Sequence, residues 1–296
     1  MTRNIIILGS GRSGTTWLHD VSSSHANIRR IFEPLHPLQV KSAAKFAGLH
    51  LKATSRNKDL YKYLNEVFYD RTHDAWLRWL HLGITKDTNP SRKAWQFGYN
   101  LPRYKFWAKN RSVKFIQANL MTKWLANSFP HPIIFMIRNP YNVIRSQLNM
   151  GWPHNTINYT RQESIREYLE EKNILEFVLS STSLVEKLTI RWCIENVLAI
   201  EEGALNHENI IAIKYETLTE NEKVFQLLSH IGYSEEETAK IKKGYQLQEK
   251  VRSTKRKSTR GDGLNQNQLH DIGNVLRMFK VDSYQSLTSD FDKIFK

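Results

Sequence analysis

The feature that most constrains the fold is the run NIIILGSGRSGTTWLHD at residues 4–20. Apolar residues lead directly into a glycine-rich loop, and a segment with helical spacing of apolar residues follows. A short apolar run bounded by glycine predicts a buried parallel strand. A strand, a glycine-rich turn and a helix in this order predict an anion site, because the first N–H groups of a helix have no partner inside it.

The loop follows the phosphate-loop pattern G-x-x-x-x-G-K-[ST] with one departure. Gly9 and Gly14 have the expected spacing and Thr16 keeps the hydroxyl position, but Thr15 stands where the pattern has lysine. Arg12 offers a positive charge from within the loop instead. We therefore expect an anion-binding loop; the structural alternative is a tight turn that binds nothing.

The rest of the chain alternates strand and helix patterns. Further strand patterns lie before Pro34 and at residues 111–120, 131–140 and 208–216. This alternation predicts an α/β fold, a P-loop-like three-layer sandwich whose central, mostly parallel sheet of about five strands is flanked by helices. We expect a single domain over residues 1–296, with the irregular, aromatic segment 38–110 as an excursion from the sheet.

Local patterns also predict where helices begin and which face they bury. Thr219 to Glu222 and Ser234 to Glu237 both match the capping box, in which a hydroxyl and a glutamate satisfy the first N–H groups of a helix. Residues 162–203 carry two long helical patterns. The second has its apolar residues on one broad face: Leu184, Leu188, Trp192, Val197 and Ile200.

Composition limits the partners and the compartment. The net charge of +14 predicts an anionic partner such as nucleic acid, a phosphorylated cofactor, an acidic glycan or a membrane surface, with a merely basic surface as the alternative. No run of about 18 apolar residues is present, so no transmembrane helix is expected. The single cysteine, Cys193, cannot form an internal disulfide. We expect a cytoplasmic protein unless a targeting segment has been removed.

A second motif bears on the ligand of the loop. A loop that served a nucleoside triphosphate and magnesium would need its lysine and a metal-binding aspartate at the end of a neighbouring strand. The strand at 131–140 instead ends IIFMIRNP, with Arg138 in that place. This favours a donor held by cations and backbone amides without a metal, although a P-loop kinase or NTPase stays an alternative.

With these residues in view, the chain resembles the sulfotransferases that use 3′-phosphoadenosine 5′-phosphosulfate (PAPS). Their first signature, [RK]-S-G-[ST]-[ST], matches Arg12 to Thr16, and their second, R-[DN]-P-x-x-V-x-x-S, matches Arg138 to Ser146. In RIFEPLHP, Glu33 follows Arg12 by 21 residues, which is similar to glycan and tyrosylprotein sulfotransferases. The arginine of the loop also resembles bacterial members of the family.

The resemblance implies roles for particular residues. Glu33 is the general base toward an acceptor hydroxyl and Arg12 a catalytic cation, while the eight-residue pair Arg138 and Ser146 contacts the 3′-phosphate. The other implied donor ligands are Gly11, Ser13, Gly14, Thr15, Thr16 and Trp17 in the loop and Tyr215, Ser253, Lys255 and Arg256 further on. Weaker matches to the family include Trp192 and Asn196.

The resemblance also implies the reaction and its partners. A sulfuryl group passes from PAPS to a hydroxyl by in-line displacement, which leaves adenosine 3′,5′-bisphosphate and needs no metal. We expect the acceptor to be a carbohydrate or another small molecule rather than nucleic acid, with residues 38–110 on its side of the site. Lys114, Gln117 and Asn119 are the candidates for a contact with the sulfuryl group.

Purely structural explanations of the same residues, and one other function, also stay open. Glu33 could simply pair with Arg29 or Arg30, and the cluster at Arg138 and Ser146 could be a helix cap. The basic stretch at 250–260 could belong to a nucleic-acid-binding module.

Overall fold

The computed structural model describes residues 4–25, 27–78, 105, 107–153, 156–220, 222–253 and 263–281, with the backbone alone described at 75, 78 and 247–253. Within these residues one parallel sheet is formed in the order β2-β3-β1-β4-β5. Its strands are β1 (Asn4–Leu8), β2 (Ile28–Phe32), β3 (Asn110–Phe115), β4 (Ile133–Ile137) and β5 (Ile210–Lys214). The α/β class and the central parallel sheet of about five strands are confirmed.

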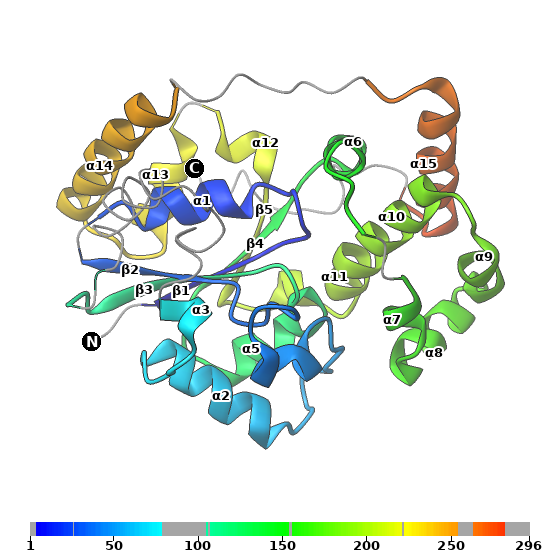
Figure 1. Ribbon diagram of the computed structural model, residues 1–296, viewed down its shortest axis with the longest axis horizontal. Helices are drawn as coiled ribbons and strands as arrows, with labels where there is room; N and C mark the ends of the chain where they lie inside the picture. The colour runs from blue at the N-terminus through cyan, green and yellow to red at the C-terminus, as the bar shows by residue number, and fades with distance from the viewer. Residues whose placement is uncertain are drawn as a thin grey trace, which may run out of the picture.

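The strand order places the first loop at a reversal of the sheet. From β1 the chain builds β2 and β3 on one side, and it later adds β4 and β5 on the other side (Figure 1). Ile6 of β1 is level with Val113 of β3 and with Ile133 of β4. Because all these strands are parallel, their carboxyl ends meet at one edge, and ligands of open α/β sheets bind where the order reverses.

Helices cover both faces of the sheet and extend beyond its carboxyl edge (Figure 1). One face carries α1 (Thr15–Ser22), α12 (Tyr215–Leu218), α13 (Lys223–His230) and α14 (Glu235–Ser253). The other face carries α2 (Lys58–Phe68), α3 (Ala75–Arg78) and α5 (Thr122–Ser128). Beyond the edge lie α6 (Pro140–Leu148), α7 (Thr156–Thr160), α8 (Glu163–Glu171), α9 (Leu175–Ser180), α10 (Leu184–Cys193), α11 (Ala199–Glu201) and α15 (Gln266–Met278). The shorter turns are η1 (Lys41–Phe46), η4 (Asn119–Met121), η5 (Ile194–Leu198) and η6 (Ala204–Asn206).

The core has two halves because side chains alternate across a strand. Ile5 and Ile7 of β1 pack with Leu18 of α1 on one face. Ile6 and Leu8 belong to the larger cluster on the opposite face. The four apolar side chains of β1 are fully buried, and each stabilises the fold by about 1.5–3 kcal/mol.

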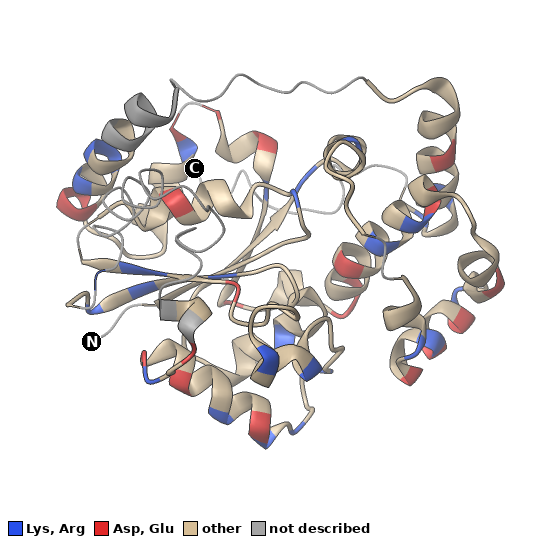
Figure 2. Ribbon diagram, viewed as in Figure 1, with Lys and Arg blue, Asp and Glu red and all other residues tan. Residues whose placement is uncertain are grey.

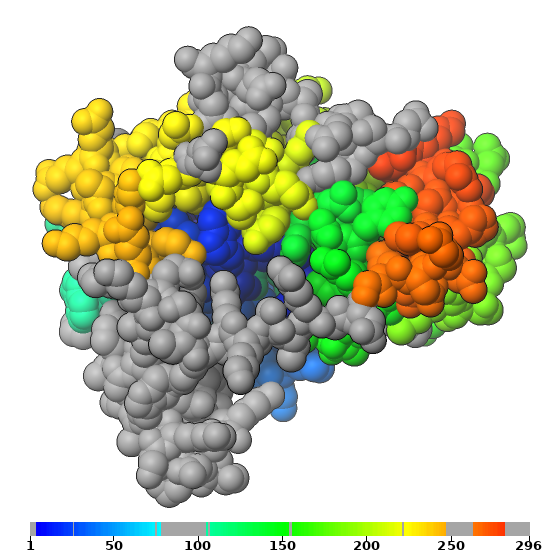
Figure 3. All heavy atoms as spheres, turned by 90° about the horizontal axis from the view of Figure 1, so that it is seen from above, coloured from blue at the N-terminus to red at the C-terminus, as the bar shows by residue number. Residues whose placement is uncertain are grey.

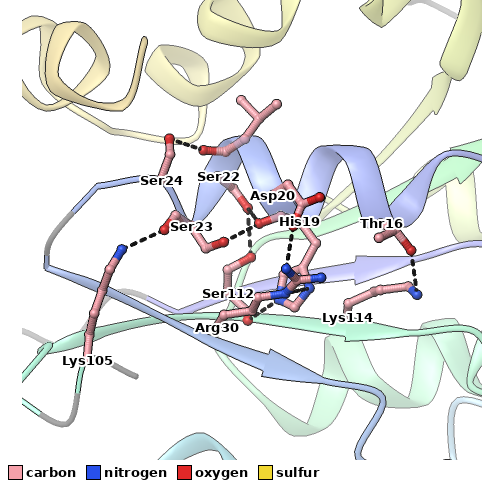
Figure 4. Close-up of polar contacts among 11 residues, drawn as sticks. Thr16, His19, Asp20, Ser22, Ser23, Ser24, Arg30, Lys105, Ser112 and Lys114 are labelled. Atoms are coloured by element: carbon pink, nitrogen blue, oxygen red, sulfur yellow. Dashed lines mark hydrogen bonds and ion pairs between the residues drawn. The ribbon is translucent and has the colours of Figure 1, made fainter. Parts of the chain in front are cut away.

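A buried polar network fixes α1 on β2 and β3 (Figure 4). The Nε of Arg30 donates to His19 Nδ1 at 3.2 Å, so the other ring nitrogen of His19 donates to the Ser112 carbonyl at 2.7 Å. Arg30 also pairs with Asp20, and the hydroxyls of Ser22 and Ser112 lie 2.8 Å apart. The loop before α1 is therefore attached to a helix that is itself held at several points.

The segment around residue 194 contains a π-helical turn. Helix α10 continues through the π turn η5 into α11. The apolar pattern steps by four from Leu188 to Trp192 but by five from Trp192 to Val197, and the wider step falls in the π turn. The prediction of a long helix in the first part of residues 162–203 is wrong, because this part forms two separate helices, α8 and α9.

The two predicted capping boxes have different outcomes. Ser234 and Glu237 form theirs: Ser234 N–H donates to Glu237 Oε2 at 2.9 Å and Glu237 N–H donates to Ser234 Oγ at 3.1 Å. The box at Thr219 and Glu222 is wrong. Thr219 Oγ donates to the Glu216 carbonyl, and Glu222 is itself the residue before α13, with a φ of 61°.

Charged residues of both signs are interspersed over the helices. Figure 2 shows Lys and Arg beside Asp and Glu along α2, α8 and α14. Among the described residues, no helix combines the length and the hydropathy needed to cross a membrane.

Candidate functional site

A cavity of about 370 Å³ lies at the carboxyl edge of the sheet. Figure 3 shows the N-terminal residues at the floor of a hollow between the segment after β5 and helix α6. The cavity is lined by Gly11, Arg12, Gly14, Thr15, Thr16, Phe32, Glu33, Lys114, Ile116, Arg138, Trp152 and Tyr215. The structure thus brings the loop, Glu33, Arg138 and Tyr215 together, although they lie far apart in the sequence.

The glycines of the loop allow close approach by two aromatic rings. A Cβ at Gly11 would lie 2.6 Å from a ring carbon of Trp152, and a Cβ at Gly14 would lie 2.2 Å from one of Tyr215. Gly14 has a φ of 94°, a region that side chains disfavour, and Arg12 also has a positive φ of 75°. The loop is thus a cradle of backbone closed on two sides by rings.

Side chains from two other elements hold the loop from behind. Gln147 of α6 donates its amide N–H to the Gly11 carbonyl at 2.8 Å, and Asn196 of η5 donates to Ser10 Oγ at 2.8 Å. Both amides are buried. Ser13 closes the turn by donating its hydroxyl to the Ser10 carbonyl at 2.6 Å. Gln147 belongs to no sequence pattern, whereas Asn196 is one of the weaker matches to the family.

The second motif reaches the same loop. Arg138 Nη1 donates to the Arg12 carbonyl at 2.9 Å, and Arg12 Nε donates to Ser146 Oγ at 2.9 Å. The Arg138 guanidinium lies 4.6 Å from the centre of the Tyr215 ring and 4.0 Å from Glu216 Oε1. Cationic groups of both motifs therefore face one region, as a ligand with two anionic groups requires.

The alternative that Arg138 and Ser146 merely cap a helix is wrong. The N-cap of α6 is Asn139, whose side chain accepts from the N–H groups of Tyr141 and Asn142. Ser146 lies near the other end of α6 and contacts Arg12 of the loop.

The opposite wall of the cavity contains a buried ion pair. Lys114 Nζ lies 2.5 Å from Glu33 Oε1 and donates to Thr16 Oγ1 at 2.9 Å, while His36 Nε2 is 3.9 Å from the other Glu33 oxygen. Glu33 has a φ of 49°, so the backbone turns sharply where β2 ends. Burial lowers the pKa of Lys114, and the adjacent Glu33 carboxylate opposes that shift.

The position of Lys114 answers two questions that the sequence left open. It places an ammonium beside the loop that lacks its own lysine. It also shows that Glu33 does not pair with the neighbouring arginines: Arg29 pairs with Asp70 and Arg30 pairs with Asp20. Phe32 is level with Lys114 across the sheet, and this register directs the Lys114 side chain toward α1.

The structure describes the side chains of only some of the remaining residues that were predicted to contact the donor. Trp17 Nε1 donates to the Tyr245 hydroxyl of α14 at 2.9 Å, and its ring meets Tyr215 edge-on at 5.8 Å. Ser253 is the last residue of α14, where the structure describes the backbone alone. Lys255 and Arg256 lie outside the described residues. Within the described part of the chain, no group of three His, Cys, Asp or Glu residues is placed to hold a metal.

Three comparisons with known proteins gave different results. The sequence model of the sulfotransferase domain matches residues 2–277, which is nearly the whole chain. Among solved structures, a sulfotransferase from Alicyclobacillus acidocaldarius is similar with a TM-score of 0.42 and 11% identity, over 100% of both chains. No curated protein matches the chain significantly.

Proposed function

Because the chain belongs to the sulfotransferase domain family, we propose that it transfers a sulfuryl group from PAPS to a hydroxyl group of a carbohydrate. The observation that carries the proposal is the pair Glu33 and Lys114, which meets the end of the phosphate loop at Thr16. A carboxylate that can take a proton and an ammonium that can face developing negative charge are thereby placed at one point. The aromatic side chains of Phe32 and Trp152 line the same cavity.

The residues of the cavity fit the donor. The cradle at Gly11 and Gly14 leaves room for backbone only, and Arg12 and Arg138 bring two guanidinium groups to its mouth. When bound, PAPS supplies an electrophilic sulfur and a phosphate leaving group. We assign the phosphosulfate to the loop and the first N–H groups of α1, where anions are stabilised.

The other donor contacts complete the proposed assignment. Arg138 and Ser146 would hold the 3′-phosphate, with Trp17 and Tyr215 beside the nucleotide. Ser253, Lys255 and Arg256 stay in the proposal as the segment that closes over it.

In the proposed mechanism Glu33 accepts the proton of the acceptor hydroxyl as that oxygen attacks. Its left-handed backbone directs the carboxylate into the cavity, and Lys114 holds one carboxylate oxygen in place at 2.5 Å. A positioned general base contributes roughly 10²- to 10⁴-fold to a rate. The cations of Lys114 and Arg12 stabilise the negative charge that develops during transfer. Because both side chains are already in place, the site does not have to reorganise as the reaction proceeds.

The proposal is tested first by binding. Adenosine 3′,5′-bisphosphate should stabilise the protein by about 2.7 kcal/mol at 100 times its dissociation constant, because it binds the folded state alone. The measurement is the melting temperature with and without ligand, and ATP with magnesium should raise it much less. Magnesium-dependent ATP turnover that is unchanged in Arg138→Ala would instead support a kinase or NTPase.

Turnover tests the acceptor. A panel of hydroxyl acceptors is incubated with sulfur-labelled PAPS, and incorporation into carbohydrates is expected above that into phenols and peptides. Glu33→Gln serves as the inactive control. Preferential labelling of a non-carbohydrate alcohol would correct the acceptor class and leave the donor site standing.

A further inference from the structure

A second cavity, of about 450 Å³, lies between helix α8, the end of η5 with the residues that follow it, and the segment around His50. Among the described residues, none that lines it also lines the donor cavity. It takes no part in the sulfuryl transfer proposed above. Its wall carries a serine, a histidine and a glutamate in hydrogen-bond contact: Ser164, His50 and Glu202.

The three side chains form one continuous chain of hydrogen bonds. Ser164 Oγ is 2.7 Å from His50 Nδ1, and His50 Nε2 is 2.8 Å from Glu202 Oε1. A carboxylate can only accept, so a neutral His50 carries its hydrogen on Nε2 and accepts the serine hydroxyl at Nδ1. A hydroxyl, a base within hydrogen-bond reach and a third group that orients the base are the parts of an activated serine nucleophile.

The surrounding structure holds this chain in place. The His50 side chain is 2% exposed, and its backbone N–H donates to Gln162 Oε1 at 2.8 Å. Gln162 also donates its amide to the Gly48 carbonyl at 2.9 Å, which ties the segment that carries His50 to the start of α8. Lys123 Nζ donates to the Glu202 carbonyl at 2.9 Å. The base and the residue that orients it are therefore fixed from several elements.

The position of Ser164 suits a nucleophile. It is the second residue of the nine-residue helix α8. The next residue, Ile165, is the first in α8 whose N–H donates to the Gln162 carbonyl. Backbone N–H groups at the second position of a helix have no acceptor inside their own helix. Unpartnered N–H groups of this kind can donate to an oxygen that gains negative charge when a nucleophile attacks a carbonyl.

The rest of the wall indicates the charge of the substrate. Four glutamates line the cavity, Glu167, Glu171, Glu201 and Glu202, against two lysines, Lys52 and Lys172. Lys172 pairs with Glu201 at 2.8 Å. The Tyr168 ring lies on the same wall, with the Lys172 ammonium 5.1 Å from its centre. In a chain of net charge +14, this local excess of carboxylates favours a positively charged ligand.

We propose that Ser164, His50 and Glu202 form a second catalytic site, which hydrolyses carboxylic esters that carry a cationic group. Ser164 Oγ bonds to the ester carbonyl carbon while its proton passes to His50 Nδ1. The bond to the alcohol then breaks, and the alcohol leaves with that proton. A water molecule next adds to the acyl group and gives a proton to His50, which returns it to Ser164 as the carboxylic acid departs. Glu202 stabilises the imidazolium in both halves.

Covalent labelling tests the nucleophile directly. The full-length chain is treated with a fluorophosphonate, which loses fluoride when an activated serine attacks its phosphorus, and the labelled peptide is identified by mass spectrometry. We expect labelling at Ser164, its loss in Ser164→Ala, and no change in the matched control Ser180→Ala on the exposed end of α9. An unlabelled wild-type chain, or a label that persists in Ser164→Ala, overturns the proposal.

Turnover tests the substrate class. Acetylthiocholine should be hydrolysed at least tenfold faster than its neutral carbon analogue, 3,3-dimethylbutyl thioacetate. Ser164→Ala should lower kcat/KM at least 100-fold, and Glu167→Gln with Glu171→Gln should remove most of the preference for the cation. Equal hydrolysis by wild type and Ser164→Ala rejects the site, and a preference for the neutral ester rejects the cationic substrate.

Two controls separate this site from the donor site. Ser164→Ala should keep its stabilisation by adenosine 3′,5′-bisphosphate, which shows that the variant is folded. Conversely, a saturating concentration of adenosine 3′,5′-bisphosphate should leave ester hydrolysis by the wild type within twofold of its value without that ligand, because the two cavities share no described lining residue.

Discussion

The two walls of the donor cavity are built on different principles. The loop wall, residues 10–16 with Arg138, Gln147 and Asn196, is held by separate hydrogen bonds of 2.8–2.9 Å to loop backbone and hydroxyl groups. The ion-pair wall is Glu33 with Lys114, both nearly excluded from solvent. Losing one neutral hydrogen bond costs about 1 kcal/mol, whereas removing one partner of a buried ion pair costs about 3–5 kcal/mol. The loop wall therefore tolerates single losses, and the ion-pair wall does not.

The largest expected effect is on turnover in Glu33→Gln. The amide cannot take the acceptor proton, so kcat for sulfuryl transfer should fall roughly 10²- to 10⁴-fold. Affinity for adenosine 3′,5′-bisphosphate, measured by calorimetry, should stay within threefold because the loop wall is untouched. Glu220→Gln, at an exposed glutamate, is the matched control. Wild-type turnover in Glu33→Gln would remove Glu33 as the base.

The next effect is on stability in Lys114→Met. This variant leaves the Glu33 carboxylate buried without its cation, so the free energy of unfolding should fall by about 3–5 kcal/mol. The measurement is urea unfolding. The double variant Glu33→Gln with Lys114→Met should be more stable than Lys114→Met alone, because it buries no lone charge. If the losses of unfolding free energy in Glu33→Gln and Lys114→Met simply add in the double variant, the two side chains are not coupled. The contrast between the ion-pair wall and the loop wall would then be wrong.

The same lysine should limit turnover at alkaline pH. Burial lowers the pKa of Lys114 below that of an exposed lysine, so its ammonium loses its proton at a lower pH. Above that pKa, kcat should fall about tenfold per pH unit. Between the folded and unfolded pKa values the folded state binds fewer protons, so stability should rise with pH while activity falls. In Lys114→Arg the alkaline fall in kcat should begin at a higher pH than in the wild type. If the fall begins at the same pH, it is caused by another group.

Arg138→Ala tests the loop wall at its charged contact. Loss of a charge-assisted hydrogen bond costs about 1.5–3 kcal/mol, so adenosine 3′,5′-bisphosphate should bind roughly 10- to 100-fold more weakly. At saturating PAPS, kcat should change less than threefold. Arg71→Ala, at an exposed arginine outside the cavity, should bind as the wild type does. Unchanged affinity in Arg138→Ala would remove it from the proposed 3′-phosphate site.

The smallest effect is expected for Gln147→Leu. It removes one neutral hydrogen bond to the Gly11 carbonyl, worth about 1 kcal/mol, so the donor product should bind about fivefold more weakly. Calorimetry provides the measurement, with exposed Gln266→Leu as control. A loss as large as that of Arg138→Ala would show that the loop wall, too, depends on single contacts.

The fold and the phosphate loop could be predicted because their determinants are local. A strand, glycine turn and helix occupy 17 consecutive residues. Arg138 and Ser146 lie only eight positions apart, one just before α6 and the other near its end. Gln147 could not be found this way, because its contact with Gly11 joins residues 136 positions apart. Lys114 was one of three candidates, since the face of a short strand is set by its pairing with β2.

Local patterns also failed where the backbone departed from its usual form. The box at Thr219 requires an ordinary first turn, but Glu222 lies in the left-handed region. The face predicted from Leu184 onward needed a π turn to stay continuous, which no propensity of the residues encodes.

The strand order has a consequence for synthesis on the ribosome. By residue 115 the chain contains β2, β3 and β1, so the Glu33–Lys114 pair can form early. The second edge of β1 is covered only when β4, at Ile133–Ile137, has emerged. Until then one edge of β1, a strand with four apolar residues, is exposed, and such an edge pairs readily with other chains. Fragments that end before β4 should therefore aggregate rather than fold, and the protein should need chaperone protection for the time that it takes to add these residues.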